Sequence, residues 1–590
     1  MKKRNIVLFL VLVLSLTSIL TACGNKETAQ SAKLKDGTYE GVGAGRGGDI
    51  KVKLTSKDGK IENIEVVEHA ESPGLDESMD ILTEKIVSNN SLNVDTVTGA
   101  TLTSHGFLSA VKNALENAGV NPKDYMDEIA VASEKEKVEQ THDVVVIGAG
   151  GGGFAAAIEA KQAGADVVIL EKLPVPGGNT LLSGGEYAAP NNWLQKDDAG
   201  DSVELFKEDI LNGGDNIANE ELVEILAENA LAGAEWLRDE INVPFEDELM
   251  FFGGHSVMRS LVPKDATGAT IINAQRQKAE ELGIPLLLNT KATELITDET
   301  GRVVGVKAES EDKEYTFTAN KGVVLATGGF GSNMEMRKEN NKDMDENILS
   351  TNSVGSTGDG ILMAKEVGAD VLDMEHIQTY PVCDPKTGSL LYFGDSRMFG
   401  HAILVNQEGE RFVEELERRD VISMAIKEQT DHIAYQLIDT FGYEDSRVGE
   451  KHEAEMNYLF NQGLLVKADT LEEAAEYFDI DTETFVNTVN TYNEYVKEGE
   501  DKDFNKRLLT EPIEKGPFYL MKVKPAVHHT MGGVRINTDA QVLNTNGEVI
   551  EGLYASGEVT GGIHGTNRLG SNAIADIIVF GRIAGKNIAK

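Results

Sequence analysis

Closely spaced glycines follow a short apolar run and could hold a phosphate group. Residues 143–147 read Asp-Val-Val-Val-Ile, and Gly148, Gly150 and Gly153 come directly after them. In such a turn the first glycine allows the sharp bend, the second lets the backbone approach a pyrophosphate, and the third allows close helix packing. Glu171 follows Gly148 by 23 residues, where an acidic side chain can accept from a ribose hydroxyl. This pattern predicts a dinucleotide-binding unit.

The sequence also indicates the strands and helices that could position these glycines. An Ala-rich segment predicts a helix that ends at Ala163, and residues 166–170 predict a second buried strand that ends at Glu171. A further strand at residues 322–325 runs into a Gly-Gly turn, and a final helix is expected to open near Ser571. Strands that alternate with helices indicate an α/β fold with a parallel sheet.

Composition excludes several classes of protein. The 590 residues include 55 Lys and Arg against 98 Asp and Glu, so the formal net charge at pH 7 is −43. Such an acidic chain repels a phosphate backbone, and nucleic-acid binding is not expected. The two cysteines, Cys23 and Cys383, are too few for a disulfide framework or a Cys-based iron–sulfur or zinc site, and no metal site is predicted. The sequence has no C-x-x-C-H motif, which excludes c-type haem.

The N-terminus is typical of an export signal. Basic residues at positions 2–4 precede an uncharged run at 6–20, which has the length of a signal-peptide core. The run ends in Leu-Thr-Ala-Cys-Gly, which resembles a bacterial lipobox and implies cleavage and lipid attachment at Cys23. We expect a lipoprotein signal peptide at 1–22, a polar tether at 23–33, and a lipid-anchored protein on the extracytoplasmic face of the cell membrane. An ordinary secretory signal with an incidental cysteine is the alternative, and it also implies export.

Residues 34–119 are expected to form a small α+β domain. Strands are predicted at 50–55 and 61–68, and a later Thr-rich motif leads into a helix that starts near Ser104. Taken alone, the motif fits a polar turn with a helix N-cap. It also resembles the D-x-x-S/T-G-A-S/T motif of FMN-binding domains through Asp95, Thr98, Gly99, Ala100 and Thr101. The resemblance implies that a flavin transferase attaches FMN to Thr101 as a covalent phosphoester, with the phosphate near a helix N-terminus.

Later motifs decide between NAD and FAD by resemblance. Gly-Gly-Asn-Thr at residues 177–180, Ser-Gly-Gly at 183–185 and Ala-Thr-Gly-Gly at 326–329 are similar to segments of flavoproteins with two dinucleotide-binding motifs. Together with Tyr-Ala-Ser-Gly-Glu at 554–558 and Arg-Leu-Gly-Ser-Asn-Ala at 568–573, they resemble the fumarate reductase and succinate dehydrogenase flavoprotein family.

This family resemblance extends over residues 141–590 and implies a Rossmann-like FAD-binding domain with an inserted α+β capping domain. The predicted order is an FMN-binding domain at 34–119, a linker at 120–140, the FAD-binding domain at 141–378 and 524–590, and a capping domain at 379–523. The implied FAD contacts are Gly148, Gly150, Gly153, Glu171, Lys172, Gly178, Asn179, Thr180, Gly184, Gly185, Ala292, Gly328, Glu558, Ser571, Asn572 and Ala573. No histidine lies between Asn179 and Gly185, where membrane-bound relatives attach FAD, so non-covalent FAD is expected.

Two arginines and a histidine are the candidate catalytic residues. Arginine beside histidine in a flavoenzyme usually anchors a carboxylate, because a guanidinium binds it bidentately. The family resemblance assigns His528 and Arg568 to a substrate carboxylate, and it assigns Arg419 to proton donation. Arg418 is adjacent to Arg419, so a shift of one position in the match to the family would assign the role to Arg418 instead.

An arginine that donates a proton needs a relay that restores it, since its side chain stays protonated at any working pH. Asp395 and Asp420 are both candidates for that relay. The family relay has a Glu and an Arg at fixed spacing, and the segment that contains Asp395 and Arg397 departs from it.

Departures from the family pattern bear on the substrate. Fumarate reductases hold a second carboxylate with a His and a Thr, where this chain has Tyr380 and Gly394, so that carboxylate would lack its partners. Glu186 stands where fumarate reductases have an apolar Met, and with Asp395 it suits an N–H-bearing or cationic group at the far end of the substrate. Glu186, Tyr380 and Asp395 together resemble the urocanate reductase branch, with the carboxylates on the ring nitrogens and the phenol near the substrate carboxylate.

We therefore predict an extracytoplasmic, flavin-dependent enoate reductase that converts urocanate to imidazole propionate and serves anaerobic respiration. FMN on Thr101 would pass electrons from a membrane or extracellular donor to FAD. Fumarate, acrylate and cinnamate are alternative substrates. The alternative class is an extracellular flavin electron carrier with no dedicated substrate.

Overall fold

The computed structural model describes most of the chain, namely residues 34–45, 48–71, 77–94, 96–97, 100–126, 135–196 and 200–590. The predicted signal peptide, Cys23 and the tether lie outside the described residues, as do Asp95, Thr98 and Gly99 of the Thr-rich motif. Within the described part, no helix has the length and apolar character needed to cross a membrane.

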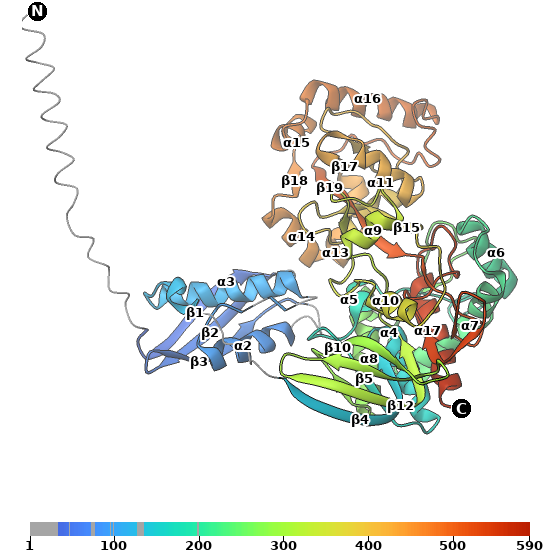
Figure 1. Ribbon diagram of the computed structural model, residues 1–590. Coiled ribbons are helices and arrows are strands. Elements are labelled where there is room, and N and C mark those ends of the chain that lie inside the picture. The colour runs from blue at the N-terminus through green and yellow to red at the C-terminus, as the bar shows by residue number, and fades with distance from the viewer. Residues whose placement is uncertain are drawn as a thin grey trace, which may run out of the picture.

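The N-terminal domain is an antiparallel three-stranded sheet with two helices packed against it (Figure 1). Its elements are β1 (Gly37–Ala44), β2 (Asp49–Lys57), β3 (Lys60–Glu68), α2 (Glu77–Asn89), α3 (Thr101–Asn117) and the 3-10 helix η1 (Pro122–Tyr125). Alternate residues of β2, including Ile50, Val52 and Leu54, are buried, as expected for a sheet with one covered face. Helix α3 can lie close to β1 because Gly41 and Gly43 have no side chains. A Cβ at either position would come within 2.1 Å of a carbonyl oxygen of α3.

Helix α3 begins earlier than the sequence predicted, at Thr101 rather than near Ser104. The amide of Ser104 donates to the carbonyl of Ala100 at 2.8 Å and closes the first helical turn. The Ser104 hydroxyl accepts from the amide of Val97 at 3.0 Å, which ties the preceding turn to the helix. The predicted FMN attachment residue is therefore the first residue of α3, and its side chain lies outside the described part.

The second domain is built on an eight-stranded sheet. Its strands are β4 (Glu136–Ile147), β5 (Val167–Leu170), β9 (Leu286–Leu287), β10 (Lys291–Thr297), β11 (Val303–Glu309), β12 (Lys313–Leu325), β21 (Gln541–Leu543) and β22 (Val549–Ala555). Strand β4 is parallel to both β5 and β12, and β22 is parallel to β12. Because these parallel strands end at the same edge, the glycine turn after β4 and the turns after β12 and β22 meet there.

The predicted linker at 120–140 ends too late. Strand β4 begins at Glu136 and pairs with β12 from Glu136, opposite Lys313, through Gln140, opposite Phe317. Residues 136–140 therefore belong to the sheet, because their backbone groups find partners in β12.

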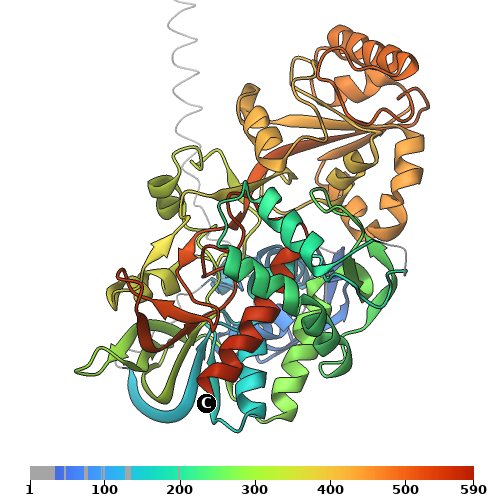
Figure 2. The same ribbon diagram turned by 90° about the vertical axis from the view of Figure 1, so that its right-hand side faces the viewer.

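Helix α4 and the C-terminal helix α17 pack against this sheet and closely against each other (Figure 2). The further elements of the domain are α4 (Gly151–Gln162), α5 (Gly178–Leu182), β6 (Tyr187–Ala188), α6 (Val203–Gly213), α7 (Glu220–Asp239), β7 (Phe245–Met250), β8 (Ser260–Pro263), η2 (Lys264–Ala266), α8 (Gly268–Glu281), α9 (Met334–Asn340), α10 (Asp359–Glu366), β14 (Val371–Leu372), β20 (Gly533–Val534) and α17 (Asn572–Ile588). Gly581 and Gly585 of α17 allow this approach, since a Cβ at either would lie within 2.6 Å of a carbonyl oxygen of α4.

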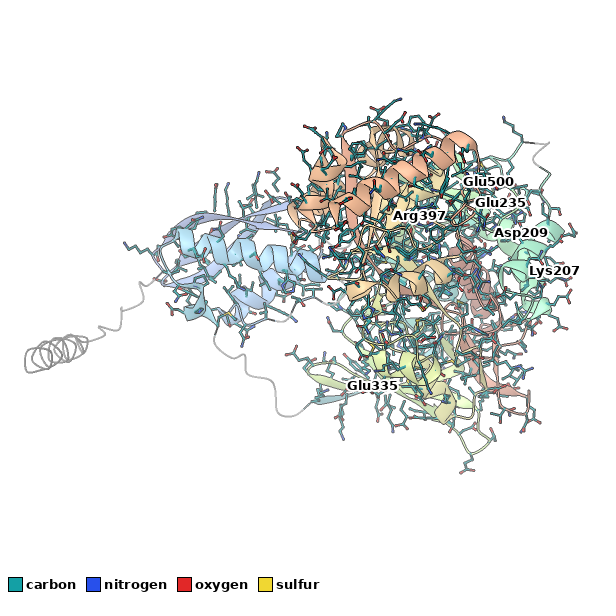
Figure 3. All side chains as sticks on the ribbon, turned by 90° about the horizontal axis from the view of Figure 1, so that it is seen from above. Lys207, Asp209, Glu235, Glu335, Arg397 and Glu500 are labelled. Carbon is teal, nitrogen blue, oxygen red and sulfur yellow. The ribbon has the colours of Figure 1, made fainter. Side chains whose placement is uncertain are left out.

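The capping domain stands above the second domain, and the N-terminal domain lies to one side of both (Figures 1 and 3). Its elements are β13 (Leu349–Ser350), β15 (Ile377–Cys383), η3 (Tyr392–Phe399), β16 (Ile403–Val405), α11 (Arg419–Lys427), η4 (Thr430–His432), β17 (Ala434–Ile438), α12 (Thr440–Ser446), α13 (Val448–Lys451), α14 (Glu453–Asn461), β18 (Leu465–Ala468), α15 (Leu471–Tyr477), α16 (Thr482–Glu498) and β19 (Phe518–Thr530). Its apolar residues form two clusters of their own, apart from the core of the sheet domain.

Strand β19 is the main connection between the capping domain and the FAD-binding domain. Over its 13 residues it pairs with β17 and β18 in the capping domain, and then with β15 and β13 toward the central sheet. The boundaries predicted at 378/379 and 523/524 fall inside β15 and β19. The chain thus passes between the domains within paired strands, and these strands carry Tyr380 and His528.

Candidate active site

One pocket extends from the glycine turn after β4 to the underside of the capping domain. The predicted FAD contacts that line it are Gly148, Gly150, Glu171, Lys172, Gly178, Asn179, Thr180, Gly184, Ala292, Gly328, Glu558, Ser571 and Ala573. Its other end is lined by all six residues predicted for substrate binding and catalysis, namely Glu186, Tyr380, Asp395, Arg419, His528 and Arg568. The structure therefore joins in one cavity residues as far apart in the chain as Gly148 and Ala573, a separation of 425 positions.

Three predicted FAD contacts lie beside the pocket wall rather than on it. Gly153 packs the first turn of α4 onto the glycine turn, because a Cβ there would lie 1.9 Å from the carbonyl oxygen of Gly148. Gly185 has a positive φ of 76° and packs against Gly268. Asn572 is fully buried as the first residue of α17. These residues shape the pocket without lining it.

The residues at the glycine turn fit a bound dinucleotide. Gly148 has a φ of 105°, and a Cβ there would lie 2.3 Å from the carbonyl oxygen of Ala326, so the turn requires glycine. A Cβ at Gly150 would meet no protein atom closer than 3.8 Å, which leaves space beside the N-terminus of α4 for a pyrophosphate. The hydroxyls of Ser556 and Thr327 line the same pocket, are buried, and have no hydrogen-bond partner among the described residues. A polar cofactor would supply those partners.

Glu171 and Lys172 lie at the far end of the cofactor part of the pocket. The Glu171 carboxylate accepts from the amides of Ala149 and Leu173 at 2.9 and 2.8 Å, and burial raises its pKa. A backbone hydrogen bond from Lys172 lowers this pKa, and the carboxylate keeps a lone pair for a ribose hydroxyl. The Lys172 ammonium instead donates to Thr357 and Asp359 at 2.7 and 2.8 Å.

A hydrogen-bond network joins the cofactor part of the pocket to the substrate part. Asn179 donates through its amide to Glu558 at 2.9 Å and to Asn352 at 3.1 Å. The other Glu558 oxygen accepts from the amide of Thr530 at 3.0 Å, at the end of β19. Burial raises the pKa of Glu558. Strand β19, which carries His528, is thereby fixed through Glu558 to Asn179 of helix α5. Both of these residues are expected to contact FAD.

The substrate part of the pocket has cationic and acidic groups close together. Burial is the main cause that raises the pKa of Glu186, and Asp395 raises it further while Arg419 and Arg568 lower it. Burial also lowers the pKa of Arg568 to about 9, with Arg419 acting in the same direction. The pKa of His528 lies well below its ordinary value because of burial and these two guanidinium groups, so its imidazole is neutral.

Tyr380 lies between the acidic and basic groups of the pocket. Its hydroxyl donates a hydrogen bond to Asp395, and its ring centroid is 5.0 Å from the guanidinium carbon of Arg419. The rings of Tyr380 and His528 are 5.5 Å apart. The phenol was predicted near the substrate carboxylate, and the structure places it beside His528 while its hydroxyl bonds to Asp395.

The structure separates the two adjacent arginines. Arg419 lines the pocket as the first residue of α11. Arg418 points to the molecular surface, where it bonds to Asp215 of the FAD-binding domain at 3.0 Å and to Asp420 at 2.8 Å. Asp420 is thus occupied by Arg418, whereas Asp395 contacts Tyr380, so the geometry favours Asp395 for the relay.

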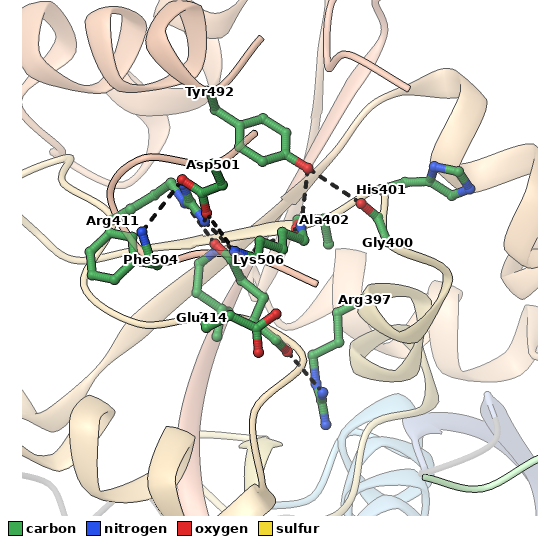
Figure 4. Close-up of polar contacts among 12 residues, drawn as sticks. Arg397, Gly400, His401, Ala402, Arg411, Glu414, Tyr492, Asp501, Phe504 and Lys506 are labelled. Atoms are coloured by element: carbon green, nitrogen blue, oxygen red, sulfur yellow. Dashed lines mark hydrogen bonds and ion pairs between the residues drawn. The ribbon is translucent and has the colours of Figure 1, made fainter. Parts of the chain in front are cut away.

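A buried ionic network holds the segment that leads to Arg419 (Figure 4). Arg411 forms a bidentate pair with Glu415 at 2.8 and 2.9 Å and also bonds to Asp501 at 2.9 Å. Arg397 donates to the carbonyl of Glu415 at 3.1 Å, and Lys506 bonds to the Tyr492 hydroxyl at 3.1 Å. Because Arg411, Glu415, Asp501 and Lys506 are buried and paired with one another, the network fixes the backbone that precedes α11.

Comparisons with known proteins agree with this architecture. A family model described as FAD binding domain matches residues 143–574, and one described as FMN-binding domain matches residues 45–116. The urocanate reductase of Eggerthella lenta is 48% identical over 557 residues, which are 93% of this chain and 92% of that protein. The NADH:fumarate oxidoreductase of Klebsiella pneumoniae is 36% identical over 95% of this chain and 59% of that protein. The chain belongs to the fumarate reductase and succinate dehydrogenase flavoprotein family.

The solved structures agree with this family. The open conformation of a flavocytochrome c3 fumarate reductase superposes with a TM-score of 0.69 and 38% identity, over 76% of this chain and 78% of that one. The predicted family, fold class, FAD-binding domain and FMN-binding domain are confirmed. This flavoprotein is therefore an oxidoreductase that acts on carbon–carbon double bonds.

Sequence reasoning missed several residues of the flavoprotein pocket. Phe252, Leu390 and Tyr392 line it, although none of them belongs to a motif that was identified in the sequence. His529 also lines it, and its position beside His528 was the available signal. Thr351 was missed as well, and it contacts His528 only because β13 pairs with β19.

Proposed function

We propose that this flavoprotein reduces the C=C bond of urocanate to give imidazole propionate. The observation that carries the proposal is the arrangement of charge in one pocket, with His528, Arg419 and Arg568 close to Glu186 and Asp395. Urocanate has a carboxylate at one end and an imidazole at the other. The basic groups suit the carboxylate, and the two carboxyl groups suit the ring nitrogens. The 48% identity to a urocanate reductase supports the same assignment.

The carboxylate of the substrate would bind to His528 and Arg568. The neutral imidazole of His528 donates one N–H, and the Arg568 guanidinium donates two in a fixed fork. Both withdraw electron density from the conjugated double bond and stabilise the charge that develops on the carboxylate as the β-carbon is reduced. When bound, reduced FAD supplies the hydride for the β-carbon.

Arg419 would supply the proton for the α-carbon, which completes the addition of a hydride and a proton across the C=C bond. Its position against the ring face of Tyr380 and the hydrogen bond from Tyr380 to Asp395 support a route that returns the proton from the Asp395 side. This is general acid catalysis by a guanidinium group, so prompt reprotonation is required in every turnover.

The electron supply and the cellular location are further parts of the proposal. We propose that FMN, attached to Thr101 by a flavin transferase, passes electrons from a membrane or extracellular donor to FAD in anaerobic respiration. The Thr-rich motif supports the attachment, and the lipobox-like segment at Cys23 supports a lipid anchor on the extracytoplasmic face.

The test is anaerobic oxidation of reduced viologen by the flavin-loaded protein with urocanate, fumarate, acrylate or cinnamate at matched concentrations. Urocanate is expected to give the highest kcat/KM. Asp395→Asn is expected to slow all four enoates, since the relay passes through Asp395, and to remove the preference for urocanate. Asp420→Asn, the matched change in the residue that bonds to Arg418, is expected to keep both the rates and the preference. Fastest turnover with fumarate would contradict the interpretation of Glu186, Tyr380 and Gly394. Equal dye oxidation with and without any enoate would instead favour an electron carrier.

A further inference from the structure

His528 contacts one side chain that no motif indicated. The short strand β13 pairs in parallel with β19, with Ser350 opposite Val527, so the next residues along the two strands, Thr351 and His528, also come together. The Thr351 hydroxyl lies 2.9 Å from Nδ1 of His528. The imidazole is neutral and therefore carries one N–H, either on Nδ1 or on Nε2. Only the form with the proton on Nε2 leaves that nitrogen able to donate to a carboxylate in the pocket.

The surrounding hydrogen bonds decide which way the Thr351 hydroxyl points. The carbonyl of Val527 is the other acceptor near this hydroxyl, at a longer distance of 3.2 Å. That carbonyl already accepts from the amide of Thr351 at 2.9 Å and from the side-chain amide of Asn352 at 3.3 Å. Since a carbonyl oxygen has two lone pairs, its capacity is filled without the hydroxyl. The hydroxyl proton is thus free for Nδ1.

We propose that Thr351 is a positioning residue that fixes the tautomer of His528, so that Nδ1 accepts from the hydroxyl and Nε2 keeps the proton that binds the substrate carboxylate. The catalytic part of this inference rests on the proposed function, because it assumes that an enoate carboxylate meets His528. The Asn179, Asn352 and Glu558 network holds the same stretch of chain, since Asn352 also donates to the carbonyl of His528 at 3.1 Å. Thr351 therefore acts from a backbone that is fixed on both sides.

The chain offers a matched control. Thr379 is a fully buried threonine on β15, paired with Val527 from the other side of β19, and its hydroxyl has no hydrogen-bond partner among the described residues. Thr351→Val and Thr379→Val make the same chemical change on two neighbours of one strand. Thr351→Ser keeps the hydroxyl.

The experiment uses the FAD-loaded protein labelled with 15N-histidine, in which His528→Gln identifies the resonances of His528. The expected 15N shifts place the proton on Nε2 in the unchanged protein, in Thr351→Ser and in Thr379→Val, and they show a mixed or Nδ1-protonated ring in Thr351→Val. In the viologen assay, kcat/KM for urocanate is expected to fall by about tenfold or more in Thr351→Val, because a buried acceptor loses its donor, and to recover in Thr351→Ser.

Two results would overturn the inference. One is an Nδ1-protonated His528 in the unchanged protein, and the other is a Thr351→Val spectrum and kcat/KM that match those of Thr379→Val. Failure of the proposed function has a different signature, since the unchanged protein would reduce no enoate while the 15N shifts still report the tautomer.

Discussion

Replacement of two adjacent arginines provides the sharpest test of the active-site geometry. Arg419 lines the pocket, whereas the side chain of Arg418 is 41% exposed and bonds to Asp215 and Asp420, which are 47% and 38% exposed. An exposed ion pair contributes about 0.2–1 kcal/mol, so the two pairs of Arg418 together contribute at most about 2 kcal/mol, which corresponds to about a thirtyfold effect. Loss of a general acid lowers kcat by about 10²- to 10⁴-fold. Arg419→Gln is therefore expected to lower kcat with urocanate by at least about threefold more than Arg418→Gln, even at the upper limit for the two exposed pairs.

The assay is anaerobic, steady-state oxidation of reduced viologen with saturating urocanate. FAD content from the visible absorbance and the thermal unfolding midpoint are measured on both variants, so that a loss of cofactor or of fold is distinguished from a loss of catalysis. Both variants remove one positive charge at consecutive positions, and each is the control for the other. A larger loss of kcat in Arg418→Gln would refute the assignment, and so would equal losses.

Further predictions concern the substrate, the cofactor and the modification. Glu186→Gln is expected to lower kcat/KM for urocanate by about tenfold or more and to leave acrylate unaffected, because only urocanate has a ring N–H for the lost carboxylate. Burial raises the pKa of Glu186 above 4.5, so kcat/KM for urocanate rises with pH as this carboxyl ionises, and a pH profile of Glu186→Gln lacks that rise. Gly150→Ala is expected to fold normally but to purify without FAD, since its Cβ fits the protein and fills the cofactor space, whereas Gly153→Ala loses thermal stability through a clash with Gly148. Thr101→Ala is expected to keep FAD and to lose the mass of covalent FMN in intact-protein mass spectrometry.

Local patterns determined the fold class and much of the cofactor site. The apolar strand, the glycine turn and the Ala-rich helix are consecutive in sequence, so their spacing alone predicts the βαβ unit that β4, α4 and β5 form. Gly153 is required by a contact with Gly148, which is close to it in the chain, whereas Gly148 is also required by Ala326, directly after the paired strand β12. Glu186, Tyr380 and Asp395 could also be identified from the sequence, because each is a difference from the family at one position within a segment that otherwise resembles it.

Contacts between distant segments were decided only by the tertiary structure. Arg419 faces the pocket and Arg418 faces the surface because α11 begins at Arg419. The sequence of two adjacent arginines does not indicate which of them points into a pocket. The relay choice required knowledge that Arg418 occupies Asp420 while Tyr380 reaches Asp395. Thr351 meets His528 across 177 positions because two strands pair, and β-strand pairing between remote segments leaves no local periodicity in the sequence. The sequence by itself determined which chemical groups this flavoprotein has, and the packing of the capping domain on the sheet decided which of them face one another.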